Sequence, residues 1–295
     1  MTENLANPKN TIEIIKKHDF TFQKRYGQNF LIDERVPEKI IAASRIGKED
    51  CVLEIGPGIG TLTRLMAEKA GFVVAVEIDR MLIPILEETL EGFGNVAVIQ
   101  NDILKCDLQA IADEYNGGRP MKVVANLPYY ITTPVVMALL ESRAPLSTVT
   151  VMVQKEVADR MKASPGTKDY GALSLAVQYH SKPQIVAEVP PNCFIPRPKV
   201  GSAVVSLEID DTHRLPEKEE EQLFKLIKAA FGQRRKTLAN AAGNNAAVPY
   251  SREETANALE SLGLDRNVRG EALDLEQFIA LSAALAEGKG NSSGN

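Results

Sequence analysis

Short β-rich hydrophobic runs alternate with helical segments between residue 50 and about residue 206. This alternation is typical of a mainly parallel sheet that is covered by helices. The runs predict seven strands: Cys51–Ile55, Val73–Glu77, Val96–Gln100, Lys122–Ala125, Val149–Gln154, Ile185–Val189 and Ala203–Ile209. Because the last members are hairpin-like, we predict a doubly wound α/β fold with an antiparallel edge.

The pattern changes after Asp211, where β-rich runs end. Apolar residues then recur at helical spacing in a set that comprises Leu223, Leu226, Ile227, Ala230 and Phe231. A similar repeat begins at Leu275. The sequence therefore predicts four parts: an N-terminal extension over 1–20, a sheet domain over 21–210, a small all-helical domain over 211–287, and a disordered Gly, Ser and Asn tail over 288–295.

Composition and charge indicate a soluble globular protein of 295 residues, with 44% hydrophobic residues and a net charge of -5. The three cysteines are far apart and form no Cys-x-x-Cys pair, which favours a reducing compartment. The three histidines are equally scattered, so we expect no metal. No run approaches about 18 apolar residues, and the first ten residues carry no apolar signal core. We therefore expect a cytoplasmic protein without a membrane span. The oligomeric state is left open, with a monomer favoured.

A glycine-rich loop joins the first predicted strand to a helix that begins near Thr61. Its sequence is Glu54-Ile-Gly56-Pro-Gly58-Ile-Gly60, and glycine lets backbone approach a ligand closely. The third glycine comes one residue earlier than in a dinucleotide fingerprint, and no Gly-Lys-Ser/Thr of a P-loop follows. The loop therefore favours a ligand with an amino-acid moiety over a pyrophosphate.

Acidic residues follow the next two strands. Glu77 lies 21 residues after Gly56, where a carboxylate can accept both ribose hydroxyls of a nucleoside. Asp102 can accept from an adenine amino group. Either residue alone fits a solvated strand-end acid, but together with the glycine loop they predict a nucleoside cleft.

The sequence Asn126-Leu127-Pro128-Tyr129 follows the fourth predicted strand. In an adenine amino group or a carboxamide, the nitrogen lone pair is delocalised, so an enzyme must accept hydrogen bonds from its N–H groups and hold its plane still. Asn126 can accept one such bond, Tyr129 can stack, and proline can aim neighbouring carbonyls into a cleft. The alternative is an ordinary strand-to-loop turn.

With these residues the chain resembles the S-adenosylmethionine-dependent rRNA adenine dimethyltransferases, and most closely their small-subunit branch. The resemblance rests on these motifs: Gly27-Gln-Asn-Phe-Leu31, Leu53-Glu-Ile-Gly-Pro-Gly-Ile-Gly-Thr61, Glu77-Ile-Asp79, Asn126-Leu-Pro-Tyr-Tyr130, Val153-Gln-Lys-Glu-Val-Ala-Asp-Arg160, the stretch from Phe194 to Val204, and Phe231-Gly-Gln-Arg-Arg-Lys-Thr-Leu238. One departure is Gly201, where an Asp is expected. The resemblance implies a Rossmann-like methyltransferase sheet, a helical C-terminal domain, and dimethylation of two adjacent adenosines in the 3′-terminal hairpin of 16S rRNA within an immature small subunit.

The resemblance also implies roles for individual residues. Contacts to the methyl donor are expected from Asn29, Leu31, Glu54, Gly56, Gly58, Gly60, Glu77, Ile78, Asp102, Ile103 and Asn126. The transfer site is expected to comprise Asn126, Leu127, Pro128, Tyr129 and Phe194. Phe194 lies in a proline-stiffened loop and is the candidate for the second face of a base held by Tyr129; core filling is its alternative. The segment from Thr21 to Leu31 is expected to fold over the donor as a lid, or simply to pack as an N-terminal segment.

RNA contact is expected from a basic set of Arg197, Lys199, Arg234, Arg235 and Lys236. Such clusters can bind phosphates despite a negative net charge, although solvated charge or a helix C-terminal charge complement are alternatives. Rival functions are a large-subunit rRNA adenine methyltransferase of the antibiotic-resistance type and a mainly non-catalytic small-subunit assembly factor. Leu127, in place of a second proline, argues against a DNA adenine or protein glutamine methyltransferase.

Overall fold

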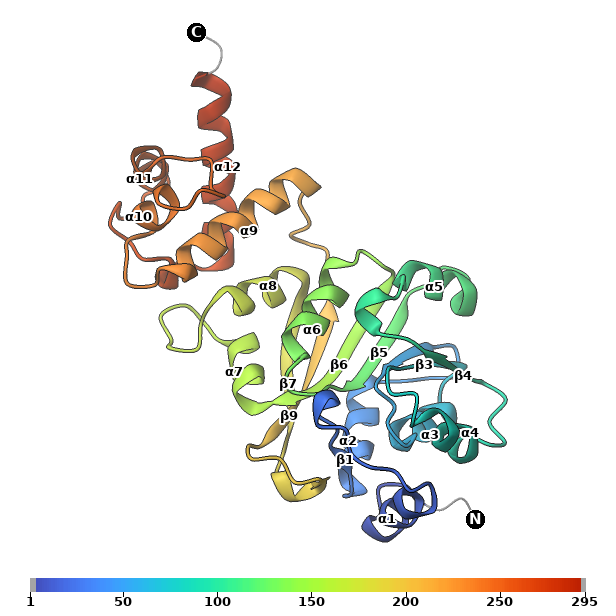
Figure 1. Ribbon diagram of the computed structural model, residues 1–295. Helices are drawn as coiled ribbons and strands as arrows, with labels where there is room; N and C mark the ends of the chain where they lie inside the picture. Colours follow the sequence, from blue (N-terminus) through green and yellow to red (C-terminus); the bar gives the residue numbers. More distant parts are fainter. Residues whose placement is uncertain (1–3, 293–295) are drawn as a thin grey trace. The chain divides into compact units, whose positions relative to one another are not determined.

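The computed structural model describes residues 4–292, and its main sheet has seven strands in the order β4-β3-β2-β5-β6-β9-β7 (Figure 1). Their bounds are β2 Cys51–Ile55, β3 Phe72–Glu77, β4 Val96–Gln100, β5 Met121–Asn126, β6 Leu146–Gln154, β7 Ser181–Val189 and β9 Ser202–Ile209. The predicted α/β fold is confirmed, with each predicted strand inside an observed one. β9 runs antiparallel to β6 and lies second from the end of the sheet.

The centre of the sheet explains why several motifs meet. β2 pairs in parallel with β3 on one side and with β5 on the other, and all five β2 residues are buried. The chain order reverses between these two neighbours, and open α/β sheets bind ligands outside the carboxyl ends of their strands at such a switch point. The residues that end β2, β3 and β5 therefore line up at one edge.

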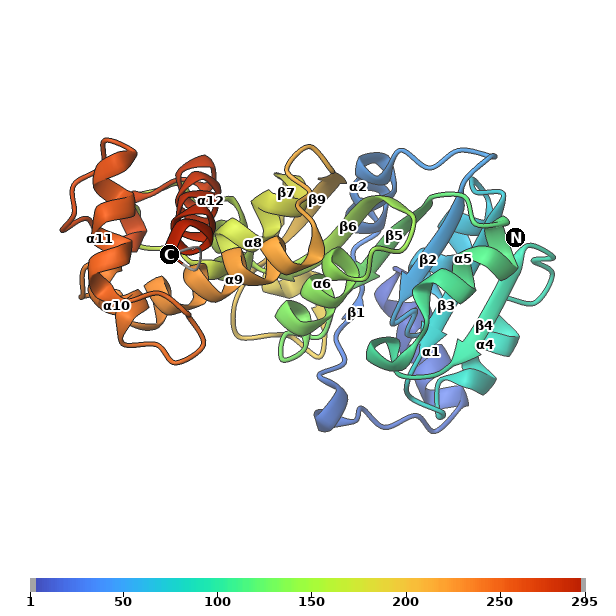
Figure 2. The same ribbon diagram turned by 90° about the horizontal axis from the view of Figure 1, so that it is seen from above.

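Helices cover both faces of this sheet. α2 Arg35–Ser44, α3 Thr61–Ala67 and α4 Ile83–Thr89 lie on one face, and α5 Leu108–Asn116 and α6 Thr132–Glu141 on the other (Figures 1 and 2). Local signals fix their ends. Asp107 caps α5 by accepting from the Ala110 amide at 3.0 Å, and Gly117 ends it with φ 60°.

The N-terminal extension forms a helix, α1 Pro8–Lys17, that packs against α4 (Figure 2). Ile14 and Ile15 of α1 pack against a buried cluster that includes Ile85 of α4; the cluster comprises Leu5, Phe20, Phe30, Ile59, Leu82 and Ile85. Lys17 Nζ and His18 Nε2 lie 2.6 and 2.9 Å from the two carboxylate oxygens of Glu88. The Lys17 hydrogen bond, followed by that of His18, lowers the pKa of Glu88. The extension thus holds the start of the predicted lid segment.

A second, two-stranded sheet was not predicted. β1 Phe30–Leu31 pairs antiparallel with β8 Phe194–Ile195, with Leu31 opposite Phe194. Strands of two residues carry no periodicity, so the pattern of apolar positions cannot reveal them. The pairing attaches the end of the lid segment to the proline-rich loop.

The remaining helices form a separate compact unit, which comprises Asp159–Ser181 and the chain from Asp210 onward. Its helices include α8 Ala172–His180, α9 Glu217–Gly232, α10 Leu238–Gly243, α11 Arg252–Ser261 and α12 Leu275–Ser292, while α7 Lys155–Lys162 begins before the unit. The division differs from the sequence boundary at residue 211 because Tyr170, Leu175 and Tyr179 belong to this core. The Tyr170 hydroxyl also donates to the Leu273 carbonyl at 2.8 Å.

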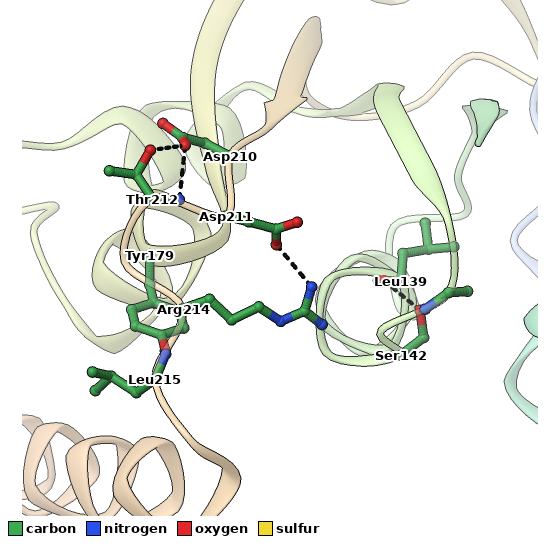
Figure 3. A network of polar contacts seen from close by, with 9 residues as sticks. Leu139, Ser142, Tyr179, Asp210, Asp211, Thr212, Arg214 and Leu215 are labelled. Atoms are coloured by element: carbon green, nitrogen blue, oxygen red, sulfur yellow. Dashed lines mark hydrogen bonds and ion pairs between the residues drawn. The ribbon is translucent and has the colours of Figure 1, made fainter. Parts of the chain in front are cut away.

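Two further features concern the ends of the helical unit. Before α9, the Tyr179 hydroxyl accepts from the Leu215 amide at 2.9 Å, and Arg214 pairs with Asp211 at 2.8 Å (Figure 3).

At the other end, α12 continues to Ser292, so the tail predicted from residue 288 is helical over its first part, because extending an existing helix is easier than nucleating one. Residues 293–295 lie outside the described residues. No helix within 4–292 is long and apolar enough to cross a membrane.

Candidate active site

A pocket lies at the carboxyl ends of β2, β3 and β5, and most of the predicted site residues line it. They are Asn29, Leu31, Glu54, Gly56, Gly58, Glu77, Ile78, Asp102, Ile103, Asn126, Leu127, Pro128, Tyr129 and Phe194. Gly60 does not line the pocket. It precedes α3 with φ 86°, and a Cβ there would lie 3.0 Å from the Thr89 hydroxyl oxygen, so the packing of the glycine loop against the end of α4 accounts for this glycine.

The glycine loop needs its backbone freedom at Gly58. This residue has φ 61°, and a Cβ would lie 3.2 Å from the Phe30 ring. Its amide points at the end of β3 and donates to Glu77 Oε2 at 3.3 Å. The loop therefore packs between Phe30 of the lid segment and the carboxylate of Glu77.

Glu54 places a buried carboxyl at the end of β2. The residue is 1% exposed, and its Oε2 has no hydrogen-bond partner among the described residues. Burial, to which the charge of Glu77 adds, raises the pKa of Glu54 to about 8. A buried acceptor without a donor is costly, and it fits a ligand that brings a positive charge or an N–H group. The end of β2 therefore presents to the pocket one buried carboxyl oxygen without a partner within residues 4–292.

The raised pKa of Glu54 makes stability depend on pH. The folded protein keeps the proton up to about pH 8, whereas the unfolded chain releases it near 4.5, so this proton favours folding less and less as pH rises from about 5 to 8. We expect the difference in unfolding free energy, Glu54→Gln minus wild type, to increase as pH rises across this range. Urea denaturation without donor measures it. The exposed Glu87→Gln variant is the control. Parallel pH profiles for wild type and Glu54→Gln would contradict the shift.

Glu77 is the second buried acid, and it is held by backbone donors. It is 4% exposed and accepts from the amides of Gly58 and, at 2.8 Å, Asp79. Burial raises its pKa to about 7, although these hydrogen bonds oppose the shift. Asp79 in turn accepts from Gln28 Nε2 at 2.7 Å. This chain of contacts connects the end of β3 to the lid segment.

The third acid, Asp102, also has a local role. Its Oδ1 accepts from the Leu104 amide at 3.1 Å and caps the short 3₁₀ helix Ile103–Lys105. The cap orients the carboxylate at the pocket wall, beside Ile103. Asp102 is therefore placed where a strand-end acid was predicted.

The side chain of Asn126 has a defined orientation. Its Nδ2 donates to the backbone carbonyl of Asn29 at 3.0 Å, so its Oδ1 points away from that carbonyl. The Pro128 carbonyl already accepts from the Ile131 amide and the Thr132 hydroxyl, both at 3.1 Å. Of the two carbonyls in the Leu127-Pro128 turn, that of Leu127 is thus better suited to bind a ligand.

Two aromatic residues flank this turn. The Tyr129 hydroxyl lies 2.8 Å from Ser202 Oγ, which fixes its ring. Phe194 is 4% exposed and packs in a core cluster with Leu31 and Met152, yet it also lines the pocket. Phe194 is therefore packed in the core and is also part of the pocket wall, while its stacking on a base stays a prediction.

Two further aromatic residues, Tyr26 and Tyr130, line the pocket and were not among the predicted site residues. Tyr130 ends the motif Asn126-Leu-Pro-Tyr-Tyr130, and Tyr26 directly precedes the motif that begins at Gly27. Their position beside predicted site residues was the available signal. Tyr130 is 57% exposed.

The predicted RNA-binding residues lie outside the pocket lining. Arg197 and Lys199 are exposed in the loop that follows β8. In the helical unit, Arg235 and Lys236 are exposed in the turn after α9, but Arg234 forms an ion pair with Glu271 at 3.2 Å and donates to the Lys168 carbonyl. Arg234 therefore has structural partners of its own. Among residues 4–292, no group of three or more His, Cys, Asp or Glu residues is arranged to hold a metal ion.

The fold and the pocket define a Rossmann-like methyltransferase. The sequence matches the family described as ribosomal RNA adenine dimethylase over residues 19–287, and the chain belongs to this family. The family resemblance seen in the motifs is thus confirmed. Proteins named ribosomal RNA small subunit methyltransferase A are similar to the chain: that of Lachnoclostridium phytofermentans is 57% identical, covering 96% of this chain and 98% of the relative, and that of Clostridioides difficile is 50% identical, covering 95% and 96%.

Solved structures agree with this assignment. A dimethyladenosine transferase from Plasmodium falciparum is 27% identical with a TM-score of 0.75, and the match covers 88% of this chain and 98% of that protein. The 23S rRNA methyltransferase ErmE is also 27% identical, with a TM-score of 0.66 and coverage of 87% and 99%. The fold is therefore shared with a dimethyladenosine transferase and with a 23S rRNA methyltransferase.

Proposed function

We propose that this protein transfers methyl groups from S-adenosylmethionine to N6 of two adjacent adenosines in the 3′-terminal hairpin loop of 16S rRNA, and dimethylates both. The substrate is an immature small ribosomal subunit, and the protein acts in the cytoplasm as a monomer. The observation that carries the proposal is the oriented amide of Asn126 beside the donor pocket. The choice of small-subunit rRNA is supported by relatives of that name at 57% and 50% identity.

The donor site is assigned to the pocket's acids. S-adenosylmethionine supplies a methyl group on a positively charged sulfur. The Glu77 carboxylate would accept from the ribose hydroxyls and Asp102 from the adenine amino group, and Ile78 and Ile103 would supply the apolar part of this site. Glu54, whose Oε2 lacks a partner, binds the amino-acid end.

The transfer step uses two acceptors and no strong base. The Asn126 Oδ1 and the Leu127 carbonyl accept the two N–H groups of the target amino group. This shifts the nitrogen toward a tetrahedral geometry and aims its lone pair at the methyl carbon. Bound S-adenosylmethionine would supply the methyl carbon, with S-adenosylhomocysteine as the leaving group, and the nitrogen would release one proton to solvent after each transfer. Tyr129 and Phe194 hold the base between them.

RNA binding is assigned in part to Arg235 and Lys236, because Arg234 already has an ion-pair partner. We expect the double change Arg235→Glu and Lys236→Glu to weaken RNA binding, and to lower the slope of log affinity against log salt by about 1 to 2. Filter binding over a range of salt concentrations measures both. The charge-matched control, Lys218→Glu with Lys228→Glu, changes exposed lysines of α9. Equal losses in the two double variants would indicate a net-charge effect instead.

The target subunit is tested by counting transferred methyl groups. The protein is incubated with radiolabelled donor and with either immature small subunits or large subunits that lack adenine methylation. We expect about four methyl groups per small subunit, two on each adenosine, and none on large subunits. Labelling of the large subunit instead would favour the function of the ErmE-like branch, which shares this fold.

A further inference from the structure

Tyr130 is an exposed aromatic residue at the rim of the candidate active site. It directly follows Tyr129, lines the same pocket and is 57% exposed. The two neighbours differ: the Tyr129 hydroxyl is hydrogen-bonded to Ser202, whereas the Tyr130 hydroxyl makes no hydrogen bond to another described residue. An exposed aromatic face beside a ligand pocket is a common site for binding a ring.

The lid segment brings a second aromatic residue and a cation to this rim. Gly27 has φ 55°, and a Cβ there would lie 3.3 Å from the Tyr130 ring and 3.5 Å from Pro128 Cβ. The preceding residue, Tyr26, lines the pocket, and the Arg25 guanidinium lies 4.6 Å from the centre of its ring. Burial raises the pKa of Tyr130, and the proximity of Tyr26 and Asp102 adds to the shift. Arg25, Tyr26 and Tyr130 therefore form one rim.

This rim combines the features of a single-stranded nucleic acid site. Aromatic rings stack on bases of any identity, and an exposed guanidinium binds the phosphate between them. A separate aromatic cluster is packed in the interior and does not include the rim residues; it comprises Phe20, Phe22 and Phe30.

We propose that Tyr130, together with Tyr26 and Arg25, binds the nucleotide that adjoins the target adenosine: the tyrosines hold its base and Arg25 its phosphate. This inference rests on the proposed function, in which two adjacent adenosines are modified in turn. In the proposed transfer site one base lies between Tyr129 and Phe194, so the adjacent base is expected to bind a surface outside this pair. Because stacking does not require free N–H groups, this rim holds the second adenosine both before and after it is methylated.

The test uses a hairpin RNA in which 2-aminopurine replaces one or the other of the two adjacent adenosines. In wild-type protein, stacking on the rim should quench the fluorescence of the adjoining base. Tyr130→Ala should abolish this quenching and raise the KM for RNA about 5- to 100-fold, as loss of one stacked base predicts, with kcat at saturating RNA less affected. Tyr130→Trp should restore both. The dissociation constant for donor, measured without RNA, should stay unchanged.

Controls separate this inference from others. Tyr115→Ala alters a tyrosine that stacks on Phe72 outside the pocket lining, and it should leave RNA use unchanged. Weakened donor binding in Tyr130→Ala with unchanged KM for RNA would place the ring in the donor site and overturn the proposal. Unchanged quenching would overturn it as well. If wild-type protein methylates the hairpin while Tyr130→Ala behaves identically, only the rim fails; if wild-type protein transfers nothing to rRNA, the proposed function fails.

Discussion

Asn126→Ala is expected to lower the rate of methyl transfer by roughly 100-fold or more, the range seen when one preorganised polar partner of a reacting group is removed. The Asn126 amide is held by its hydrogen bond to the Asn29 carbonyl, so its oxygen is oriented before the substrate arrives. Alanine removes that acceptor while β5 and its neighbours keep their backbone pairing. Single-turnover kinetics with saturating donor and small subunits measures the chemical step.

Donor affinity and folding must be followed in the same variant. Donor affinity should change by no more than a few fold, because Glu54, Glu77 and Asp102 are unaltered. The exposed Asn267→Ala variant carries the same substitution in the helical unit and should transfer methyl groups at the wild-type rate. Full transfer by Asn126→Ala would remove Asn126 from the mechanism.

Glu77→Gln is expected to weaken donor binding about 10- to 100-fold, as loss of a charge-assisted hydrogen bond predicts. Both neighbouring amides, of Gly58 and Asp79, donate to the carboxylate. The glutamine amide group has only one oxygen, so its NH₂ must face either a backbone N–H group or the ribose hydroxyls. Isothermal titration with S-adenosylmethionine measures the loss.

The same chemical change at Glu87, an exposed residue of α4, should leave donor affinity unaltered. RNA affinity without donor should be retained in both variants. If Glu77→Gln bound donor as tightly as the wild type, the ribose would have to be held by another group.

The strands of the sheet could be predicted because their signals are local. The buried run Cys51–Ile55 is apolar except for Glu54 and is bounded by turn residues, so its own pattern predicts a strand. The contribution of residues 159–181 to the helical unit could not be predicted. Apolar residues in and before α8, such as Tyr179 and Tyr170, indicate a buried segment. They do not indicate whether it packs in the core of the sheet domain or in that of the helical unit.

The site could be predicted to a similar extent. Residues at strand ends, such as Glu77 and Asn126, meet because parallel strands end at one edge. Contacts between distant loops left no such signal. The bond between Asn126 and the Asn29 carbonyl spans 97 residues, and the Arg234–Glu271 ion pair joins a turn to a short helix. Neither contact could be predicted from the spacing of residues in the sequence. The Arg234–Glu271 ion pair also leaves Arg235 and Lys236, rather than Arg234, as the candidates for RNA binding in this turn.

We expect this chain to dimethylate adenine N6 in small-subunit rRNA by means of the oriented Asn126 amide. The most direct measurement is mass spectrometry of rRNA fragments from unmodified small subunits after incubation with donor and either wild-type protein or Asn126→Ala. The predicted result is N6,N6-dimethyladenosine at two adjacent positions of the 3′-terminal hairpin with wild type, and almost none with the variant. Methylation at another position or atom, or equal modification by both proteins, would contradict the account.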